Sequence, residues 1–334
     1  MLPKTFKAYR VAEDGLGKGR YCDLTSADLG EGAVTVKVIY SSINYKDALA
    51  ATGRGHILKQ FPLVPGIDLA GRVATSTDDR FKTGDAVLVT GCGIGEAHDG
   101  GYSEYQRVDP DWIVPLPKGL SLRDSMILGT AGFTAALAIH RLEQMGQTAE
   151  QGRFVVTGAS GGVGTLAVNM LSARGYDVVA VSGKPELRDF LYGLGARQVS
   201  SLGELGLGKR PLESARFGGA IDNVGGEVLS GLLASVNLWG NIASVGLAQS
   251  HELKATVMPF ILRGVSVLGI SSSNCPMPLR RELWSRLAGD MRPQNLAAIL
   301  TQEVALAETG TLFDDMINRK THGRILVKCG EDRV

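Results

Sequence analysis

The stretch VVTGASGGVG, residues 155–164, joins an apolar segment of strand character to a cluster of glycines that leads into a helical segment. Residues 159–164 follow the pattern A-x-G-x-x-G. Each small residue of this pattern meets one structural requirement. The first allows a sharp turn, the second lets a pyrophosphate approach the backbone closely, and the third lets the helix pack tightly on the strand. Gly161 and Gly164 meet the last two requirements. A strand before the glycines and a helix after them favour a dinucleotide site over a turn without a ligand.

Strands and helices alternate through the rest of this part of the chain. Strand patterns occupy residues 153–158, 177–183, 218–226, 240–248 and 265–273, and helical patterns occupy 165–175, 185–196 and 228–237. The strands are near-continuous runs of Val, Ile and Ala, which is typical of a parallel sheet covered on both faces. We therefore predict a doubly wound parallel sheet.

The first third of the chain has a different pattern. Short β-type segments alternate with turns at residues 34–40, 69–76, 85–91 and 112–117, which predicts a mostly antiparallel, barrel-like domain. Two helical segments that meet at GTAGFTA, residues 129–135, mark the change to the alternating pattern. The closing strand, RILVK, is expected to return to the first domain. We predict an α/β protein with a β-barrel-type domain at 1–126, a parallel-sheet domain at 127–272, and a segment at 273–334 that completes the first domain.

Composition excludes several classes of function. The 334 residues carry a formal net charge of +1, which provides no field for binding a polyanion. The N-terminus lacks the apolar region of a signal peptide, and no apolar run approaches the ~20 residues that cross a bilayer, so we expect a cytoplasmic protein. The four cysteines contain no CxxC pair, which fits neither a disulfide framework nor a structural zinc site.

The end of the strand at 177–183 indicates which dinucleotide is bound. NAD-binding forms usually place Asp or Glu there to hold the ribose 2′-hydroxyl. This chain has Ser182-Gly183-Lys184 instead, with Arg188 one turn further on. A missing carboxylate and an added cation favour a 2′-phosphate, so we predict NADPH.

Long motifs resemble the medium-chain dehydrogenase/reductase superfamily over nearly the whole chain. They are PGIDLAGRV (65–73), GTAGFTA, GASGGVG and GRILVK. Zinc-dependent members ligate their catalytic metal with a cysteine in the first active-site loop and with a GHE motif. This chain has Asn44-Tyr45-Lys46-Asp47 in that loop and Gly66-Ile67-Asp68 in place of GHE, which cannot supply a zinc ligand set. No metal site is expected.

Within the zinc-free branch, the chain resembles the acrylyl-CoA reductase family, also called YhdH-type quinone oxidoreductases. SSINYKDALAATGRG (41–55), FPLVPGIDLAG (61–71) and VMPFILRGVSVLG (257–269) carry this resemblance. It implies a GroES-like domain joined to a Rossmann domain, in a cytoplasmic homodimer. It also implies NADPH-dependent reduction of the carbon–carbon double bond of acrylyl-CoA to propionyl-CoA.

The reaction needs hydride delivery to the β-carbon, stabilisation of an enolate oxygen and a proton for the α-carbon. Tyr45 is the first candidate, as a phenol beside the cofactor, although a loop tyrosine also packs with its hydroxyl on backbone. Asn44 and Asp47 are candidates to orient the site or to touch substrate or cofactor. Asp68 is expected to bond backbone in the PGIDLAG turn.

The resemblance also implies a set of cofactor contacts. Ser160, Gly161, Gly162 and Val163 are expected at the pyrophosphate, Ser182, Gly183 and Lys184 at the adenosine phosphate, and Leu247, Ile261 and Ser272 near the nicotinamide half. Arg319 stands where the family usually has asparagine, which departs from the pattern for a cofactor contact. Tyr45 is a further expected contact.

A CoA thioester carries phosphates, so basic residues are needed at the mouth of its site; Arg54, Lys59 and Arg324 are candidates. Two other functions stay open. A quinone reductase would need an open apolar cleft and no CoA site, and a non-enzymatic protein of this fold would bind NADPH without turning over an acceptor.

Overall fold

The computed structural model describes residues 2–12 and 19–332, and its chain divides into two compact units. The first comprises the residues up to Thr130, Ser273–Asp290 and the segment from Leu300 onward, and the second comprises Ala131–Ser272 and Met291–Ile299. The division thus falls four residues later than the boundary expected at 126/127. In addition, residues 291–299 belong to the second unit, whereas the whole of 273–334 was expected in the first.

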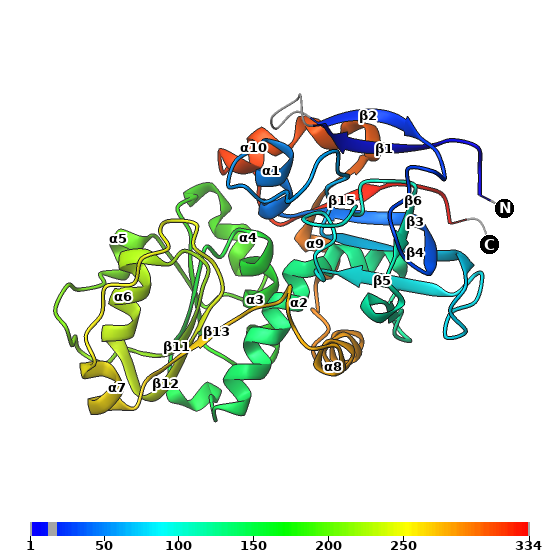
Figure 1. The fold of residues 1–334 in the computed structure, drawn as a ribbon. Coiled ribbons are helices and arrows are strands. Elements are labelled where there is room, and N and C mark those ends of the chain that lie inside the picture. Colours follow the sequence, from blue (N-terminus) through cyan, green and yellow to red (C-terminus); the bar gives the residue numbers. More distant parts are fainter. Residues whose placement is uncertain (1, 13–18, 333–334) are drawn as a thin grey trace. The chain divides into compact units, whose positions relative to one another are not determined.

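The second unit is built on a six-stranded parallel sheet in the order β10-β9-β8-β11-β12-β13 (Figure 1). Its strands are β8 (Phe154–Thr157), β9 (Val178–Val181), β10 (Gln198–Ser200), β11 (Phe217–Asp222), β12 (Val236–Ser244) and β13 (Ser266–Gly269). All residues of β8, β9 and β11 are buried, because helices cover both faces of a doubly wound sheet. The predicted Rossmann-type sheet is confirmed.

Helices connect these strands. They are α3 (Gly162–Ala173), η4 (Pro185–Leu187), α4 (Arg188–Gly193), α5 (Leu202–Leu205), α6 (Gly226–Ser235) and α7 (Met258–Arg263). The second unit also contains η3 (Ala149–Gln151), which precedes β8, and α9 (Leu296–Ile299), which follows the sheet in the chain. Leu229, Leu232 and Leu233 of α6 pack into the apolar core against Val155 and Val179 of the sheet. Each α6 leucine is buried at the i, i+3, i+4 spacing of one helix face.

The first unit is mostly antiparallel, as predicted. A seven-stranded sheet runs in the order β14-β15-β3-β4-β5-β7, with β6 on β3, and β1 pairs with β2 separately. The strands are β1 (Phe6–Val11), β2 (Gly19–Leu24), β3 (Val34–Ile43), β4 (Asp68–Ser76), β5 (Ala86–Thr90), β6 (Tyr105–Val108), β7 (Val114–Pro115), β14 (Leu300–Ala305) and β15 (Arg324–Lys328). As expected, β15 returns to this unit and pairs with β3 from Ile325↔Ile43 to Lys328↔Tyr40.

Two details of the first unit differ from the expectations. Residues 112–117 do not form one strand, because Pro110–Trp112 make a 3₁₀ turn (η2) and only Val114–Pro115 pair as β7. Pro115 and Pro117 lack backbone N–H groups, which limits how many residues of this stretch can join a ladder. Strand β14, which pairs in parallel with β15, was not anticipated.

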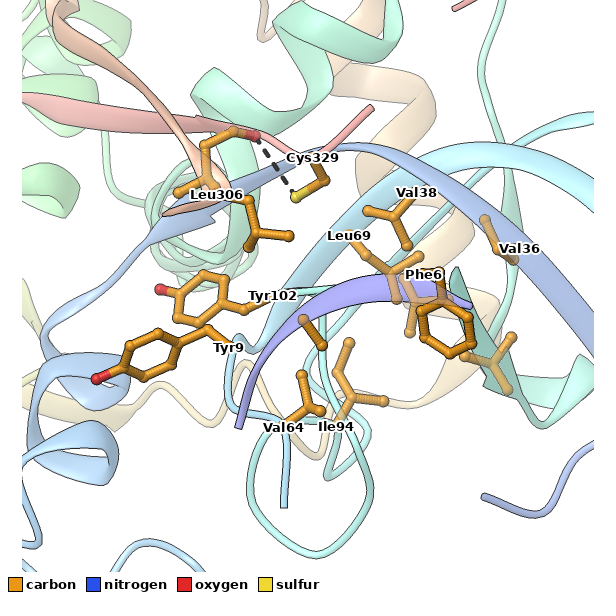
Figure 2. Packing of buried hydrophobic residues seen from close by; sticks show 14 of the residues in the cluster. Phe6, Tyr9, Val36, Val38, Val64, Leu69, Ile94, Tyr102, Leu306 and Cys329 are labelled. Carbon is orange, nitrogen blue, oxygen red and sulfur yellow. Dashed lines mark hydrogen bonds between the residues drawn. The ribbon is translucent and has the colours of Figure 1, made fainter. Parts of the chain in front are cut away.

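Apolar side chains from both sheets of the first unit form its core (Figure 2). Val36 and Val38 of β3 and Leu69 of β4 pack there with Phe6 of β1. The thiol of Cys329 also lies in this core, and burial raises its pKa well above the usual range of a cysteine. The unit's helices are α1 (Tyr45–Ala51), α2 (Leu122–Gln144, which continues into the second unit), α8 (Met277–Ala288), η5 (Leu306–Thr311) and α10 (Phe313–Ile317).

Helix α2 is interrupted at Gly129, which has φ 50° and ψ −155°. This confirms the predicted meeting of two helical segments at GTAGFTA. A Cβ atom at Gly129 would lie 2.5 Å from a carboxylate oxygen of Asp68 and 2.8 Å from the guanidinium of Arg324, so both the conformation and the space require glycine. The expectation that no apolar run approaches the length needed to cross a bilayer is corrected here, because α2 is long and apolar enough by composition. Even so, 89% of its most apolar window is buried, as in the core helix of a globular unit.

Gly164 allows α3 to lie directly against the turn that follows β8. A Cβ atom there would overlap the carbonyl oxygen of Gly158 and would lie 2.7 Å from the Cα of Ala159, and neither backbone atom can move aside. We expect Gly164→Ala to lower the free energy of unfolding by about 1–3 kcal/mol, as overpacking typically does. Denaturant unfolding would measure the change.

Gly193→Ala is the matched control, because Gly193 is exposed at the end of α4 and an added Cβ would meet no atom within 4 Å. Alanine there should be neutral or stabilising by up to about 1 kcal/mol. Equal stability of the two variants would contradict the packing role of Gly164.

Candidate active site

The glycine-rich turn follows β8 and leads into α3. Gly158, with φ 59°, adopts the left-handed conformation that reverses the chain, so this glycine supplies the sharp turn that the pattern A-x-G-x-x-G assigns to its first position. An added Cβ at Gly161 would meet only the Gly158 carbonyl oxygen, at 3.4 Å, which leaves its outer side open to a ligand. The N-terminus of α3 lies here, where backbone N–H groups and the helix dipole suit an anion.

Two buried serines tie this turn to the end of β9. The hydroxyl of Ser182 donates a hydrogen bond to the hydroxyl of Ser160 (3.0 Å), and the backbone N–H of Lys184 donates to the Ser182 hydroxyl (3.1 Å). Burial lowers the pKa of Lys184, with the charge of Glu186 opposing that shift. Arg188 lies 3.7 Å from Glu204, so its charge already has a partner. The predicted pyrophosphate and adenosine-phosphate positions therefore lie together at the carboxyl ends of adjacent strands.

The end of β11 contributes a polar cluster that the sequence analysis did not single out. The Thr157 hydroxyl donates to the buried carboxylate of Asp222 (2.6 Å), and the N–H of Gly225 donates to the same carboxylate (2.7 Å). Burial raises the pKa of Asp222. The side-chain amide of Asn223 donates to the Thr157 carbonyl (2.7 Å). These bonds fix the base of the turn; the only sequence signal was Asp-Asn directly after an apolar strand.

The three residues expected at the nicotinamide half do not all lie at the same end of the sheet. Leu247 and Ser272 follow β12 and β13, so they lie at the carboxyl end of the sheet, as the glycine-rich turn does. Ile261 lies on α7, which precedes β13, and the neighbouring Arg263 donates to the carbonyls of Ala234 and Val236 at the amino end of β12. Ile261 thus lies at the opposite end of the sheet from the glycine-rich turn of the same chain, and its contact with the cofactor stays a prediction.

Arg319 belongs to the first unit and is exposed just after α10. Its φ of 59° is the left-handed conformation that asparagine and glycine adopt more easily than arginine. The backbone of this position thus accounts for asparagine as the usual residue there.

A buried polar network in the first unit surrounds Asp68. Its carboxylate accepts from the Ser42 hydroxyl (2.7 Å), from the side-chain amide of Asn44 (2.7 Å) and from the Thr130 hydroxyl (2.6 Å), and the Thr130 N–H also donates to it (2.9 Å). Asp68 was expected to bond the PGIDLAG turn. The carboxylate that does so is Asp47, which accepts from the Ile67 N–H (2.9 Å).

Arg324 completes this network and is only 2% exposed. Its guanidinium donates to the carbonyl of Ile127 (2.9 Å), to the hydroxyl of Ser42 (2.7 Å) and to the side-chain oxygen of Asn44 (3.1 Å), and it lies 3.9 Å from Asp68. A buried, fully engaged guanidinium cannot bind phosphates at a surface, so Arg324 is removed from the CoA candidates. Arg54 and Lys59 are exposed, as expected for such candidates.

Asn44 and Asp47 hold the start of α1. The Asn44 N–H and side-chain amide both donate to the Asp47 carboxylate (2.8 and 3.2 Å). Burial, reinforced by the charge of Asp68, raises the pKa of Asp47 to about 7, while the N–H donors of Asn44 and Ile67 oppose that shift. Asp47 has no exposed surface, and the amide of Asn44 is engaged by Asp47, Asp68 and Arg324. Both side chains therefore hold the start of α1 and its neighbours in place, which favours the predicted orienting role over direct contact with substrate or cofactor.

Tyr45, the first residue of α1, is placed differently from these two neighbours, since it is 45% exposed. Its phenol is open to a ligand. In the ranges 2–12 and 19–332, the structure contains no group of three His, Cys, Asp or Glu side chains that could hold a metal ion.

Comparison with known proteins identifies the family. Residues 30–118 match the profile of the alcohol dehydrogenase GroES-like domain, and residues 162–288 match that of a zinc-binding dehydrogenase. The chain is 44% identical over 316 residues to acrylyl-CoA reductase AcuI of Ruegeria pomeroyi, covering 94% of this chain and 96% of that one. It is 48% identical over 306 residues to YhfP of Bacillus subtilis, provisionally named a quinone oxidoreductase, covering 91% and 93%.

Solved structures agree with this relationship. The B. subtilis yhfP structure with NAD bound has a TM-score of 0.95 at 45% identity, covering 98% of this chain and 100% of that one. The yhdH oxidoreductase of Salmonella enterica in complex with NADP has a TM-score of 0.91 at 46% identity, covering 98% and 99%. This protein therefore belongs to the acrylyl-CoA reductase and YhdH-type quinone oxidoreductase family of oxidoreductases, within the medium-chain dehydrogenase/reductase superfamily.

Proposed function

We propose that this protein reduces the carbon–carbon double bond of acrylyl-CoA, or of a similarly short 2-enoyl-CoA, to the saturated thioester with NADPH and without zinc. The observation that carries the chemistry is the network built on Asn44, from the loop where zinc-dependent members have a cysteine, and Asp68, from the GID stretch that replaces GHE. The amide of Asn44 bonds to Asp68 and to Arg324, and the guanidinium of Arg324 lies 3.9 Å from Asp68. The substrate class rests on the relatives named acrylyl-CoA reductase.

The residues of the glycine-rich turn fit a dinucleotide. Backbone N–H groups of Ser160, Gly161, Gly162 and Val163 would hold the pyrophosphate at the start of α3, and the open side of Gly161 admits it. Ser182, Gly183 and Lys184 would hold the 2′-phosphate, since a cation stands where a carboxylate would otherwise bind a 2′-hydroxyl. When bound, NADPH supplies the hydride.

Independence from zinc follows from the chemistry of the side chains. An amide is a poor zinc ligand, and the carboxylate of Asp68 is engaged by hydrogen-bond donors and lies 3.9 Å from a guanidinium. The buried positive charge of Arg324 compensates the negative charge of Asp68. A bound metal ion is not needed for that purpose. Without a Lewis acid, oxidation of an alcohol is disfavoured.

Exposed apolar residues support a homodimer. Trp239 of β12 and Ile261 of α7 are 72% and 73% exposed, and Leu238, Val257 and Leu262 are also exposed. Helix α7 packs on β12, because Gly264 lies against the ring of Trp239, so these side chains share one face. Such a patch marks an interaction surface. We propose that two copies of the chain associate through this face.

We also propose that the protein is located in the cytoplasm.

Two other functions remain candidates. Reduction of a quinone is favoured by the provisional name of the B. subtilis relative, and a non-enzymatic protein would bind NADPH alone. We expect kcat/KM for NADPH oxidation with acrylyl-CoA to exceed that with a simple benzoquinone by at least tenfold. A higher value for the quinone would reverse the assignment, and NADPH binding without turnover of either acceptor would show a binding protein.

Lys184→Ala tests the cofactor assignment. Loss of a charge-assisted contact with the 2′-phosphate, typically worth about 1.5–3 kcal/mol, should weaken NADPH binding by about 10- to 150-fold and leave NADH binding nearly unchanged. Fluorescence titration would give both dissociation constants. Arg188→Ala is the matched control, because its guanidinium already faces Glu204. Equal weakening of NADPH and NADH by Lys184→Ala would refute a 2′-phosphate contact.

Asp47 makes the stability of the protein depend on pH. A carboxyl whose pKa is raised by folding keeps its proton in the folded state and loses it in the unfolded state between pH about 4 and about 7. Its contribution to stability is therefore complete below pH about 4 and falls as the pH rises toward 7. We expect the stability advantage of the wild type over Asp47→Asn to shrink by up to about 1.4 kcal/mol per pH unit across this range.

Denaturant unfolding at pH 5 to 8 would measure that difference, with Asp111→Asn, at an exposed aspartate of the same unit, as the matched control. An advantage that stays constant with pH would mean that folding does not shift the ionisation of Asp47.

A further inference from the structure

Lys46 carries a positive charge that the fold holds in one place. Its ammonium nitrogen lies 2.9 Å from a carboxylate oxygen of Glu96 and donates to the hydroxyl of Ser273 (3.4 Å). The side chains of Lys46 and Glu96 are 35% and 21% exposed, so the pair is half-buried. Among the described residues these two partners occupy two of the three N–H donors, which leaves one for a ligand.

The backbones of both partners of Lys46 are held by hydrogen bonds. The carbonyl of Glu96 accepts from the N–H of Lys59 (2.8 Å). The carbonyl of Ser273 accepts from the N–H of Cys92 (3.2 Å) and from the buried guanidinium of Arg280 (3.0 Å). That guanidinium also donates to the carbonyl of Thr90 at the end of β5 (2.6 Å). The ammonium group therefore rests on a rigid support, whereas a typical surface lysine is free to move.

The position of Lys46 in the chain connects it with the proposed reaction. It follows Tyr45 on α1, whose first turn is held by Asn44 and Asp47, and its partner Ser273 follows Ser272, an expected neighbour of the nicotinamide. Arg324, the other cation of this region, is buried and engaged. Arg54 is exposed and only 3.9 Å from an exposed aspartate, so it is not held in the same way.

We infer that Lys46 binds the thioester carbonyl oxygen of the substrate and stabilises the enolate; this inference rests on the proposed function. The hydride would come from a C–H bond of NADPH, which would be oxidised to NADP⁺. Its addition at the β-carbon forms a C–H bond there and moves the electron pair of the C=C bond toward the thioester, so negative charge collects on the carbonyl oxygen. The free N–H of Lys46 donates to that oxygen. Water then gives a proton to the α-carbon, and the carbonyl re-forms. A prepositioned donor of this kind strengthens its interaction as charge develops.

Lys46→Met is the test, because methionine keeps the unbranched chain up to the ε position and removes the ammonium group with its charge. Loss of one oxyanion donor should lower kcat with acrylyl-CoA by about 100- to 1,000-fold. The affinities for NADPH and for propionyl-CoA should change less than about fivefold, since neither carries the enolate charge. The kinetic isotope effect with NADPH deuterated at the transferred position should rise, because hydride transfer becomes rate-limiting. Lys46→Arg should recover part of kcat.

Lys7→Met is the matched control, since Lys7 is a similarly exposed lysine (41%) of the same unit that pairs with Asp23 at 2.8 Å. It should change neither kcat nor the isotope effect. If folded Lys46→Met keeps kcat within about threefold of the wild type, or if Lys7→Met loses as much, the inference is overturned and the proposed function stands. A wild type that does not reduce acrylyl-CoA overturns both.

Discussion

Burial of one guanidinium constrains most of the first unit. An isolated ion in a protein interior is unfavourable by several kcal/mol, so Arg324 requires partners that are fixed and complete. It finds carbonyl oxygens at Ile127 and Ile43, the Ser42 hydroxyl, the Asn44 side chain and the charge of Asp68. These partners come from the end of β3, the start of β4 and the interrupted helix α2. The break in α2 at Gly129 follows from this arrangement, because any side chain there would meet Asp68 and Arg324.

The same network divides the residues of the 44–47 loop into two groups. Some fix the backbone of the loop, and others are at least partly exposed and can touch a ligand. The side-chain amide of Asn44 is hydrogen-bonded to two carboxylates and to the guanidinium of Arg324, and Asp47 is completely buried. Their bonds fix the first turn of α1, so Tyr45 and Lys46 leave the helix in defined directions. The second unit is organised in the same way, since Thr157 and Asp222 bond to each other at the base of the glycine-rich turn, while the open side of Gly161 stays accessible.

Local features of both units could be predicted from the sequence, and distant contacts could not. Three of the predicted features depend on residues close together in the sequence. They are the glycine spacing, the strand–helix alternation and the break at GTAGFTA, and all three are present in the structure. The partners of Arg324 lie up to 282 residues away, and arginine is usually exposed, so a surface role was the natural expectation. Asp68 was assigned to its own turn for the same reason. The place of Ile261 at the far end of the sheet could not be predicted either, because the resemblance matches positions along the chain and does not say where they lie in the sheet.

A site of this kind also limits which acceptors are chemically reasonable. Removing hydride from an alcohol needs a Lewis acid or a base that lowers the pKa of the hydroxyl group. Adding hydride to a double bond conjugated with a carbonyl needs only hydrogen-bond donors where negative charge develops. The proposed acceptors, an acrylyl thioester and a quinone, both contain a conjugated carbonyl, so a metal-free arrangement suits either. What separates them is the remainder of the molecule, because only the thioester brings phosphates. Since Arg324 is buried, the proposed preference for CoA would rest on exposed cations, of which Arg54 and Lys59 are the predicted ones, and on the fit of the acyl group.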